Sequence, residues 1–136
     1  MTGYEYEYYV AAWLRNNDFE NVIVTKGSGD FGVDIIAYKN NCKCAVQCKY
    51  YSKGVGIKAI QEVISGKMYY NCEIAVVVTN SYFTPNARKL AESADVILLE
   101  KIDFEIEAVE PNSPTNNSSY TRNTFSPKEP SDEPSN

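Results

Sequence analysis

Apolar side chains recur along the first hundred residues with two different periods, which indicates alternating helices and strands. Near the N-terminus, Val10, Ala11 and Leu14 lie three, four and seven positions after Glu7, a spacing that places all four on one face of a helix. Further along, Thr84-Pro85 is typical of an N-cap followed by proline at the first helical position. Helices are predicted at about residues 3–17, 57–68 and 84–94.

Five short segments with β-branched or alternating apolar residues predict strands, at residues 22–24, 33–38, 43–50, 74–79 and 96–99. The Lys-Asn-Asn at 39–41 suits a hairpin connection, and the unbroken apolar run at 74–79 is typical of a central strand buried on both faces. Residues 26–30 predict a turn in which Asp30 caps backbone amides. The order α-β-β-β-α-β-α-β predicts an α/β fold with a mixed sheet and helices packed on it.

Length and composition favour one domain followed by a flexible tail. A chain of 136 residues suits a single hydrophobic core. Five of the six prolines lie beyond residue 110, among Asn, Ser and Thr, and such a segment buries too little apolar surface to offset the entropy of ordering it. We therefore expect an ordered domain at residues 1–107 and a flexible tail at 108–136.

The sequence predicts a cytoplasmic protein with reduced cysteines. No segment approaches the roughly 20 continuous apolar residues of a membrane span, and the first residues do not resemble a secretory signal. The four cysteines are therefore expected to be reduced core residues, with Cys44 and Cys48 buried on one strand face. Zinc is not expected, because Cys42 and Cys44 are only one residue apart and the chain contains no histidine.

The absence of histidine excludes nucleophilic triads and nucleases that use a histidine as general base, which leaves carboxylates, lysines and bound metal. The net charge of −5 divides into −2 over residues 1–106 and −3 over 107–136. No acid occurs between Asp34 and Glu62, whereas five lysines do: Lys39, Lys43, Lys49, Lys53 and Lys58. These lysines form either a patch that contacts a phosphate backbone or a set of solvated hairpin residues.

Alternation along residues 43–50 places Gln47 and Lys49 together on one strand face and apolar residues such as Val46 on the other. An exposed strand alternates in the same way, so this pair alone is a weak indication of a site. Asp34 begins the neighbouring strand and would lie across the hairpin from Gln47 and Lys49. A carboxylate in that position is a compact way to place one metal ion beside a lysine.

Three further groups have two interpretations each. Glu7 shares an apolar helical face, where an ionised carboxylate needs a cation or metal partner, but it also lies in the first turn, where the helix dipole favours a solvated acid. Gln61, on the inward face of the second helix, either holds the site lysine or a phosphate or is an ordinary helix-edge amide. Thr79-Asn80 either supports the site or simply ends the central strand.

Four segments together resemble the catalytic domain of Mrr-type restriction endonucleases, in the PD-(D/E)xK nuclease superfamily: GYEYE at 3–7, GDFGVD at 29–34, VQCK at 46–49 and VTN at 78–80. The resemblance covers about residues 3–100. It implies that the family's aspartate matches Asp34, its Q-x-K matches Gln47 and Lys49, and its helical glutamate matches Glu7. Glu5 competes for the last role but lies off the apolar helical face. Glutamine, usual in the Mrr group, replaces the stronger acidic ligand of many superfamily members.

The resemblance implies a restriction or defence endonuclease that cleaves DNA with Mg²⁺, or with Mn²⁺ as a substitute. In the implied mechanism Asp34, assisted by Glu7 and Gln47, binds the metal, which lowers the pKa of a bound water, and Lys49 orients or deprotonates that water. Two alternatives stay open: a structure-selective nuclease resembling a Holliday-junction resolvase, and a catalytically silent nucleic-acid-binding module. The sequence does not decide between a homodimer and a chain recruited by a partner protein.

Overall fold

The computed structural model describes residues 1–25 and 31–104 of the chain. The predicted turn at 26–30, with Asp30, and the predicted tail at 108–136 lie outside these residues. All the helices and strands described lie within Met1–Lys101, one of two units into which the chain divides. The domain boundary at residue 107 therefore stays a prediction.

Within the described residues the chain forms eight elements in the predicted order α-β-β-β-α-β-α-β. The helices are α1 (Gly3–Asn16), α2 (Ile57–Tyr69) and α3 (Pro85–Ala94). The strands are β1 (Glu20–Val24), β2 (Ile35–Lys39), β3 (Cys42–Lys49), β4 (Ile74–Thr79) and β5 (Val96–Leu99). The hydrophobic pattern therefore predicted each of these elements and its type correctly.

The five strands form one mixed sheet in which spatial order follows chain order, β1-β2-β3-β4-β5. The pairs β1–β2 and β2–β3 are antiparallel, whereas β3–β4 and β4–β5 are parallel. This change follows from the connections, because a tight turn reverses the chain between β2 and β3 while α2 and α3 carry it across to the next parallel strand. The sheet confirms the predicted α/β class, with a mixed sheet and helices packed on it.

The turn between β2 and β3 fixes the register of this strand pair. Asn40 and Asn41 have φ angles of 53° and 66°, as the two central residues of a type I′ hairpin turn require. Asparagine tolerates this conformation better than most residues do. The resulting register pairs Ile35 with Val46, which sets Asp34 beside Gln47. The short turn thus brings two candidate site residues together.

The starts of α1 and α3 are set by threonine caps. Thr84 Oγ1 accepts a hydrogen bond of 3.2 Å from the backbone of Ala87, and Pro85 takes the first helical position, as predicted. Thr2 caps α1 in the same way. None of the helices in the described part of the chain has both the length and the apolar character needed to cross a membrane.

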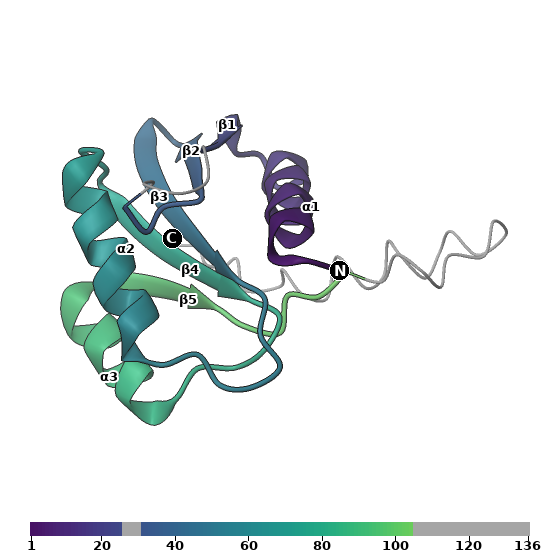
Figure 1. Cartoon of the computed structure of the whole chain (residues 1–136). Helices are drawn as coiled ribbons and strands as arrows, with labels where there is room; N and C mark the ends of the chain where they lie inside the picture. Colours follow the sequence, from purple (N-terminus) through teal and green to yellow (C-terminus); the bar gives the residue numbers. More distant parts are fainter. Residues whose placement is uncertain (26–30, 105–136) are drawn as a thin grey trace, which may run out of the picture. The chain divides into compact units, whose positions relative to one another are not determined.

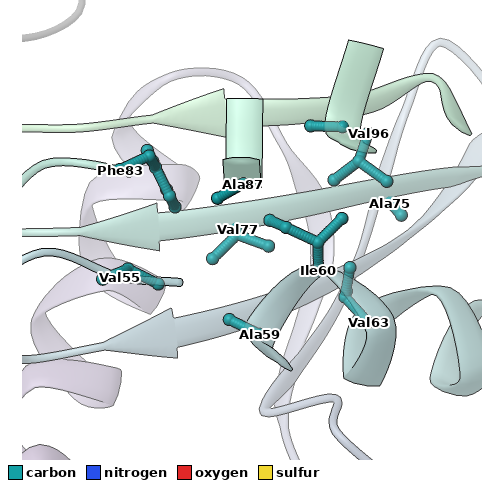
Figure 2. Packing of buried hydrophobic residues seen from close by; sticks show 10 residues of the cluster. Val55, Ala59, Ile60, Val63, Ala75, Val77, Phe83, Ala87 and Val96 are labelled. Carbon is teal, nitrogen blue, oxygen red and sulfur yellow. The ribbon is translucent and has the colours of Figure 1, made fainter. Parts of the chain in front are cut away.

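Helices cover both faces of the sheet, with α2 and α3 on one face and α1 on the other (Figure 1). Beneath α2 and α3, small and branched side chains from the helices and from β4 pack into a buried cluster (Figure 2). Ala75 and Val77 of β4 belong to this cluster, whereas Val76 and Val78 point to the opposite face. All four are buried, which confirms β4 as a central strand covered on both sides.

The four cysteines carry free thiols, and three of them are buried. Cys44 and Cys48 are 2% and 9% exposed, as predicted. Burial raises the pKa of the Cys44 thiol to about 12 and raises that of Cys48 well above its usual value, because desolvation disfavours the thiolate. Both thiols therefore remain protonated near neutral pH and serve as small core side chains.

Candidate active site

Gln47 and Lys49 extend from the face of β3 that α2 covers. The register pairs Gln47 with Val77, which belongs to the cluster beneath α2, and pairs Lys49 with Thr79. Gln47 is only 3% exposed, and the Lys49 side chain is 23% exposed. The predicted shared face is confirmed, and it places one polar amide inside largely apolar surroundings.

Asp34 is fixed against β3 through both its backbone and its side chain. Its backbone N–H donates a 2.8 Å hydrogen bond to the carbonyl of Val46. Its carboxylate Oδ2 accepts a 2.8 Å hydrogen bond from the backbone N–H of Cys48. A hydrogen bond to an ionised acceptor is stronger than a neutral one, so this contact holds the carboxylate beside the strand that carries Gln47 and Lys49.

Glu7 lies on α1, on the other side of the sheet, and is partly buried. The negative charges of Asp34 and Glu7 both raise the pKa of the Cys48 thiol, in addition to the larger effect of its burial. Both carboxylates therefore lie near Cys48, one residue before Lys49. The structure thus brings all four sequence candidates, from α1, the start of β2 and the end of β3, to one end of the sheet.

Glu5 has a different structural role. Its backbone N–H donates to Thr2 Oγ1 at 3.1 Å, and its carboxylate Oε1 accepts from the backbone N–H of Thr2 at 2.8 Å. These two reciprocal bonds form a capping box at the start of α1. Glu5 is exposed, so Glu7 is the better candidate for the helical glutamate of the site.

The prediction that Gln61 lies on the inward face of the second helix is wrong. Gln61 is exposed, whereas the adjacent Glu62 is partly buried. Glu62 Oε1 accepts a 2.9 Å hydrogen bond from Gln47 Nε2 and lies 3.6 Å from Lys49 Nζ. One carboxylate oxygen of α2 therefore contacts both residues of the Q-x-K pair, a contact that residue spacing alone does not reveal.

Two glycines allow α2 to approach the segment that leads into Asp34. A Cβ atom on Gly32 would lie 2.6 Å from the backbone oxygen of Glu62, and Gly32 also has a φ of +76°, which favours glycine. A Cβ atom on Gly66 would meet Val33 and the backbone of Phe31. The glycine at position 32 is thus needed for the close packing that sets Glu62 next to Gln47.

The five lysines between Asp34 and Glu62 do not form one patch. Lys39 Nζ donates to the carbonyl of Asn17 at 2.8 Å, and Lys43 Nζ donates to the carbonyl of Tyr70 at 2.7 Å. Lys43 and Lys49 stand at opposite ends of β3, about 20 Å apart at the usual rise of a strand. The expectation that Lys39 and Lys43 adjoin the site is therefore wrong.

Lys53 and Lys58 do lie at the end of the sheet that carries Lys49. Both side chains are exposed. Lys53 belongs to the loop that follows β3, and Lys58 is the second residue of α2. Near the site, the basic surface of the described residues therefore includes the end of β3, the loop after it and the start of α2.

The loop after β3 is held by three consecutive polar residues at the end of β4: Thr79, Asn80 and Ser81. Thr79 Oγ1 donates to the carbonyl of Lys49 at 2.7 Å, and Ser81 Oγ donates to the carbonyl of Lys53 at 2.8 Å. Between them, the Asn80 amide is hydrogen-bonded to Tyr51. Of the two interpretations of Thr79-Asn80, the structure favours support for the site, because these side chains fix the backbone from Lys49 onward.

Comparison with known proteins relates this domain to one protein family. The family model of the Mrr catalytic domain, described as restriction endonuclease, matches residues 1–105. The chain belongs to this family. The match extends from α1 to the end of the described residues, so it includes all four candidate site residues of the Mrr-type domain. No curated protein sequence matches the chain significantly.

Two solved structures share the fold of this Mrr-type domain. A protein of unknown function, AF1548, has 17% sequence identity and a TM-score of 0.60 over 73% of this chain. The DNA modification-dependent restriction endonuclease AspBHI has 21% identity and a TM-score of 0.56 over 71% of this chain. The chain spans 58% of the length of the first protein and 27% of the second. At these identities the similarity shows a common fold.

Restriction endonucleases generally use divalent metal ions, and the residues of this Mrr-type site fit such an ion. Gln47 Oε1 is buried and has no hydrogen-bond partner among the described residues. A buried acceptor without a partner costs about 1–3 kcal/mol, which a bound cation offsets. Among the described residues, no group of three or more His, Cys, Asp or Glu side chains is arranged for a metal. Carboxylate and amide oxygens are suitable ligands for Mg²⁺.

Proposed function

We propose that this chain is a Mg²⁺-dependent endonuclease of the restriction type, which acts in the cytoplasm and hydrolyses phosphodiester bonds in DNA. The observation that carries the proposal is the buried oxygen of Gln47, which has no hydrogen-bond partner among the described residues. Gln47 lies beside Asp34 of the neighbouring strand segment and two residues before Lys49. A module that only bound DNA would gain nothing from this costly buried acceptor. The acceptor is useful where a cation binds, which favours an enzyme over the silent module.

The residues of the site have separate roles in this proposal. Asp34, Glu7 and Gln47 provide the oxygen ligands. A Mg²⁺ ion held by these residues would withdraw electron density from the phosphate and lower the pKa of a water. Lys49 orients the attacking water and stabilises the negative charge that develops on the phosphate. The hydrogen bond from Cys48 to Asp34 keeps the acid in place, so little reorganisation is needed when DNA binds.

DNA approaches the end of the sheet where β3 and β4 terminate. Lys53 and Lys58 are exposed there, and their positive charges attract the phosphate backbone. Lys49 Nζ lies 5.8 Å from the centre of the Tyr51 ring, so the site lysine borders an aromatic surface as well. Lys39 and Lys43, at the other end of the sheet, have no part in this binding surface.

The test is cleavage of supercoiled plasmid DNA with Mg²⁺, with Mn²⁺ and with EDTA. We expect cleavage with either metal and none with EDTA. Lys49→Ala should abolish cleavage with little change in melting temperature, because the partly exposed Lys49–Glu62 ion pair contributes less than about 1 kcal/mol. The matched control is Lys89→Ala, an exposed lysine on α3. A folded protein that cuts no DNA with either metal would refute the proposal.

The choice of DNA distinguishes restriction-type cleavage from the resolvase alternative. Plain duplex, methylated duplex and four-way junctions should be compared under the same conditions. The methylated duplex is included because AspBHI, which shares the fold, is described as DNA modification-dependent. Cleavage of either duplex supports the proposal, and cleavage of junctions alone would identify a structure-selective nuclease.

A further inference from the structure

The two ends of the Gln47 amide have different surroundings. Its Nε2 donates a 2.9 Å hydrogen bond to Glu62 Oε1, while its Oε1 is buried without a hydrogen-bond partner in residues 1–25 and 31–104. The oxygen and the NH₂ group of an amide have nearly the same shape, so the fit of the side chain alone does not fix its orientation. The groups next to the two ends of the amide must therefore fix its orientation.

Glu62 provides this discrimination. A carboxylate accepts hydrogen bonds and does not donate them, so only the NH₂ group of Gln47 can face it favourably. The opposite orientation would set the amide oxygen against the carboxylate oxygen of Glu62 and put the NH₂ group where the buried, unpartnered oxygen now lies. An amide bonds a hard cation only through its oxygen. The orientation of Gln47 therefore decides whether this side chain is a metal ligand.

On the basis of the proposed function, we propose that Glu62 is a positioning residue that orients the Gln47 amide so that its oxygen faces the metal. Glu62 also lies 3.6 Å from Lys49 Nζ, so the same oxygen helps to place the site lysine. The Q-x-K pair thus depends on an acid from α2.

The packing of α2 supports this role independently of the hydrogen bond. Gly32, two residues before Asp34, lies directly against the backbone of Glu62, where a Cβ atom would come within 2.6 Å of the carbonyl oxygen. The position of Glu62 is therefore fixed relative to both Asp34 and Gln47. The adjacent Gln61 has no such contact and is exposed, which makes it a suitable control.

The arrangement predicts an unusual result for Gln47→Glu. This change adds a stronger ligand, but it also sets two carboxylates at hydrogen-bond distance, which is unfavourable unless one is protonated. Gln47→Glu alone should therefore bind metal more weakly than the wild type. Combining it with Glu62→Gln exchanges the two groups, because the amide introduced at position 62 can donate its NH₂ to the carboxylate introduced at position 47. The double variant should recover most of the lost affinity.

The experiment measures Mn²⁺ binding to the full chain by calorimetry, together with the metal-induced rise in melting temperature and plasmid cleavage. Glu62→Gln should weaken Mn²⁺ binding by about 10- to 100-fold, the usual effect of removing a group that orients a metal ligand. The control Gln61→Glu, which adds a charge one residue away, should bind Mn²⁺ as the wild type does. Where Glu62→Gln also lowers the melting temperature without metal, the rise on adding Mn²⁺ still reports metal affinity.

Three outcomes would overturn the role of Glu62. These are unchanged Mn²⁺ affinity in Glu62→Gln, metal binding by Gln47→Glu at least as tight as in the wild type, and a double variant that binds no better than either single variant. Each of these outcomes counts against the role of Glu62 when the wild-type protein binds metal and cleaves DNA. A wild type that does neither would instead refute the proposed function, together with the inference that rests on it.

Discussion

The side-chain amide of Asn80 forms two hydrogen bonds with the backbone of Tyr51, one as acceptor and one as donor, each 2.8 Å long. Tyr51 follows Lys49 by two residues, and Asn80 follows β4 by one. The pair therefore joins the loops that leave two neighbouring strands. Because these loops border the site, the stability of the loop after β3 is linked to the position of Lys49.

Replacing Asn80 should therefore affect both stability and activity. Asn80→Ala removes both hydrogen bonds and should lower the free energy of unfolding by about 1–2 kcal/mol, since each net bond contributes about 0.5–1.5 kcal/mol. We also expect a lower rate of cleavage, because the backbone carrying Lys49 is less restrained. Urea unfolding and single-turnover cleavage measure the two effects. Asn80→Asp keeps only the hydrogen bond in which this side chain is the acceptor, so its stability should be intermediate. Wild-type stability in Asn80→Ala would show that the two hydrogen bonds to Tyr51 do not hold the loop.

Glu7 and Glu5 offer a matched pair of substitutions in one helix. Glu7→Gln removes a proposed ligand charge and should raise the Mg²⁺ concentration needed for half-maximal cleavage by about one to two orders of magnitude, because ligand charge sets metal affinity. Glu5→Gln keeps a side chain able to complete the capping box and should cost only about 0.3–1 kcal/mol of stability. Mg²⁺ titrations of cleavage separate the two variants. The same Mg²⁺ requirement in both would remove Glu7 from the site.

The buried thiols should make stability fall at alkaline pH. The pKa of Cys44 is raised by burial from 9.0 to about 12, so above pH 9.0 the unfolded chain loses a proton that the folded chain keeps. The free energy of unfolding must then decrease as the pH rises from 9.0 toward 12. Melting temperatures on both sides of pH 9.0 measure this slope. Cys44→Ala should have a shallower slope than the wild type, and an identical slope would show that this thiol does not contribute.

A chain shortened to residues 1–107 should fold and cleave DNA. The family match ends at residue 105, and the composition beyond residue 107 provides few large apolar side chains for a core. A cooperative thermal transition and wild-type cleavage of plasmid DNA are the expected results. Loss of the cooperative transition in the shortened chain would show that the C-terminal segment contributes to the folded domain.

Much of the fold was predictable because its strongest determinants are local in sequence. The period of apolar residues defined the helices and strands, and the Asn40-Asn41 turn joined β2 to β3 with the register that sets Asp34 beside Gln47. Strand alternation then placed Gln47 and Lys49 on one face without further information. These parts of the site depend on neighbours along one hairpin, so sequence spacing was sufficient to find them.

Glu62 was missed because α2 has apolar residues on two faces. The helix face that carries Gln61 also carries the apolar residues Ile57 and Met68, at helical spacing, yet these two are 39% and 75% exposed. The buried face is formed by small or branched residues, Ala59, Ile60, Val63 and Gly66. Had the face with these smaller side chains been assigned to the core, Gln61 would have been placed outward and Glu62 toward the sheet. The periodicity of one helix gives no reason to assign that face, rather than the face with Ile57 and Met68, to the core.

The lysine patch was misjudged for a different reason. Counting charges along the sequence treated residues 39–58 as one neighbourhood, although β3 extends between them. An extended strand separates its ends by about 3.3 Å per residue, so charges close in sequence lie far apart in space. The distribution of Lys43 and Lys49 along β3 is a direct consequence of this extension.

The antiparallel hairpin has a practical consequence for work with this protein. The start of β2 and the C-terminal ends of β3 and β4 meet at one end of the sheet. The exposed Asn40-Asn41 turn therefore lies at the opposite end of the strands. A fluorophore attached at this turn would be held about 26 Å from Lys49 by the length of β3, at the usual rise of about 3.3 Å per strand residue. The turn is therefore a natural attachment point for surface immobilisation or energy-transfer measurements, because it leaves the approach of a long DNA molecule unobstructed.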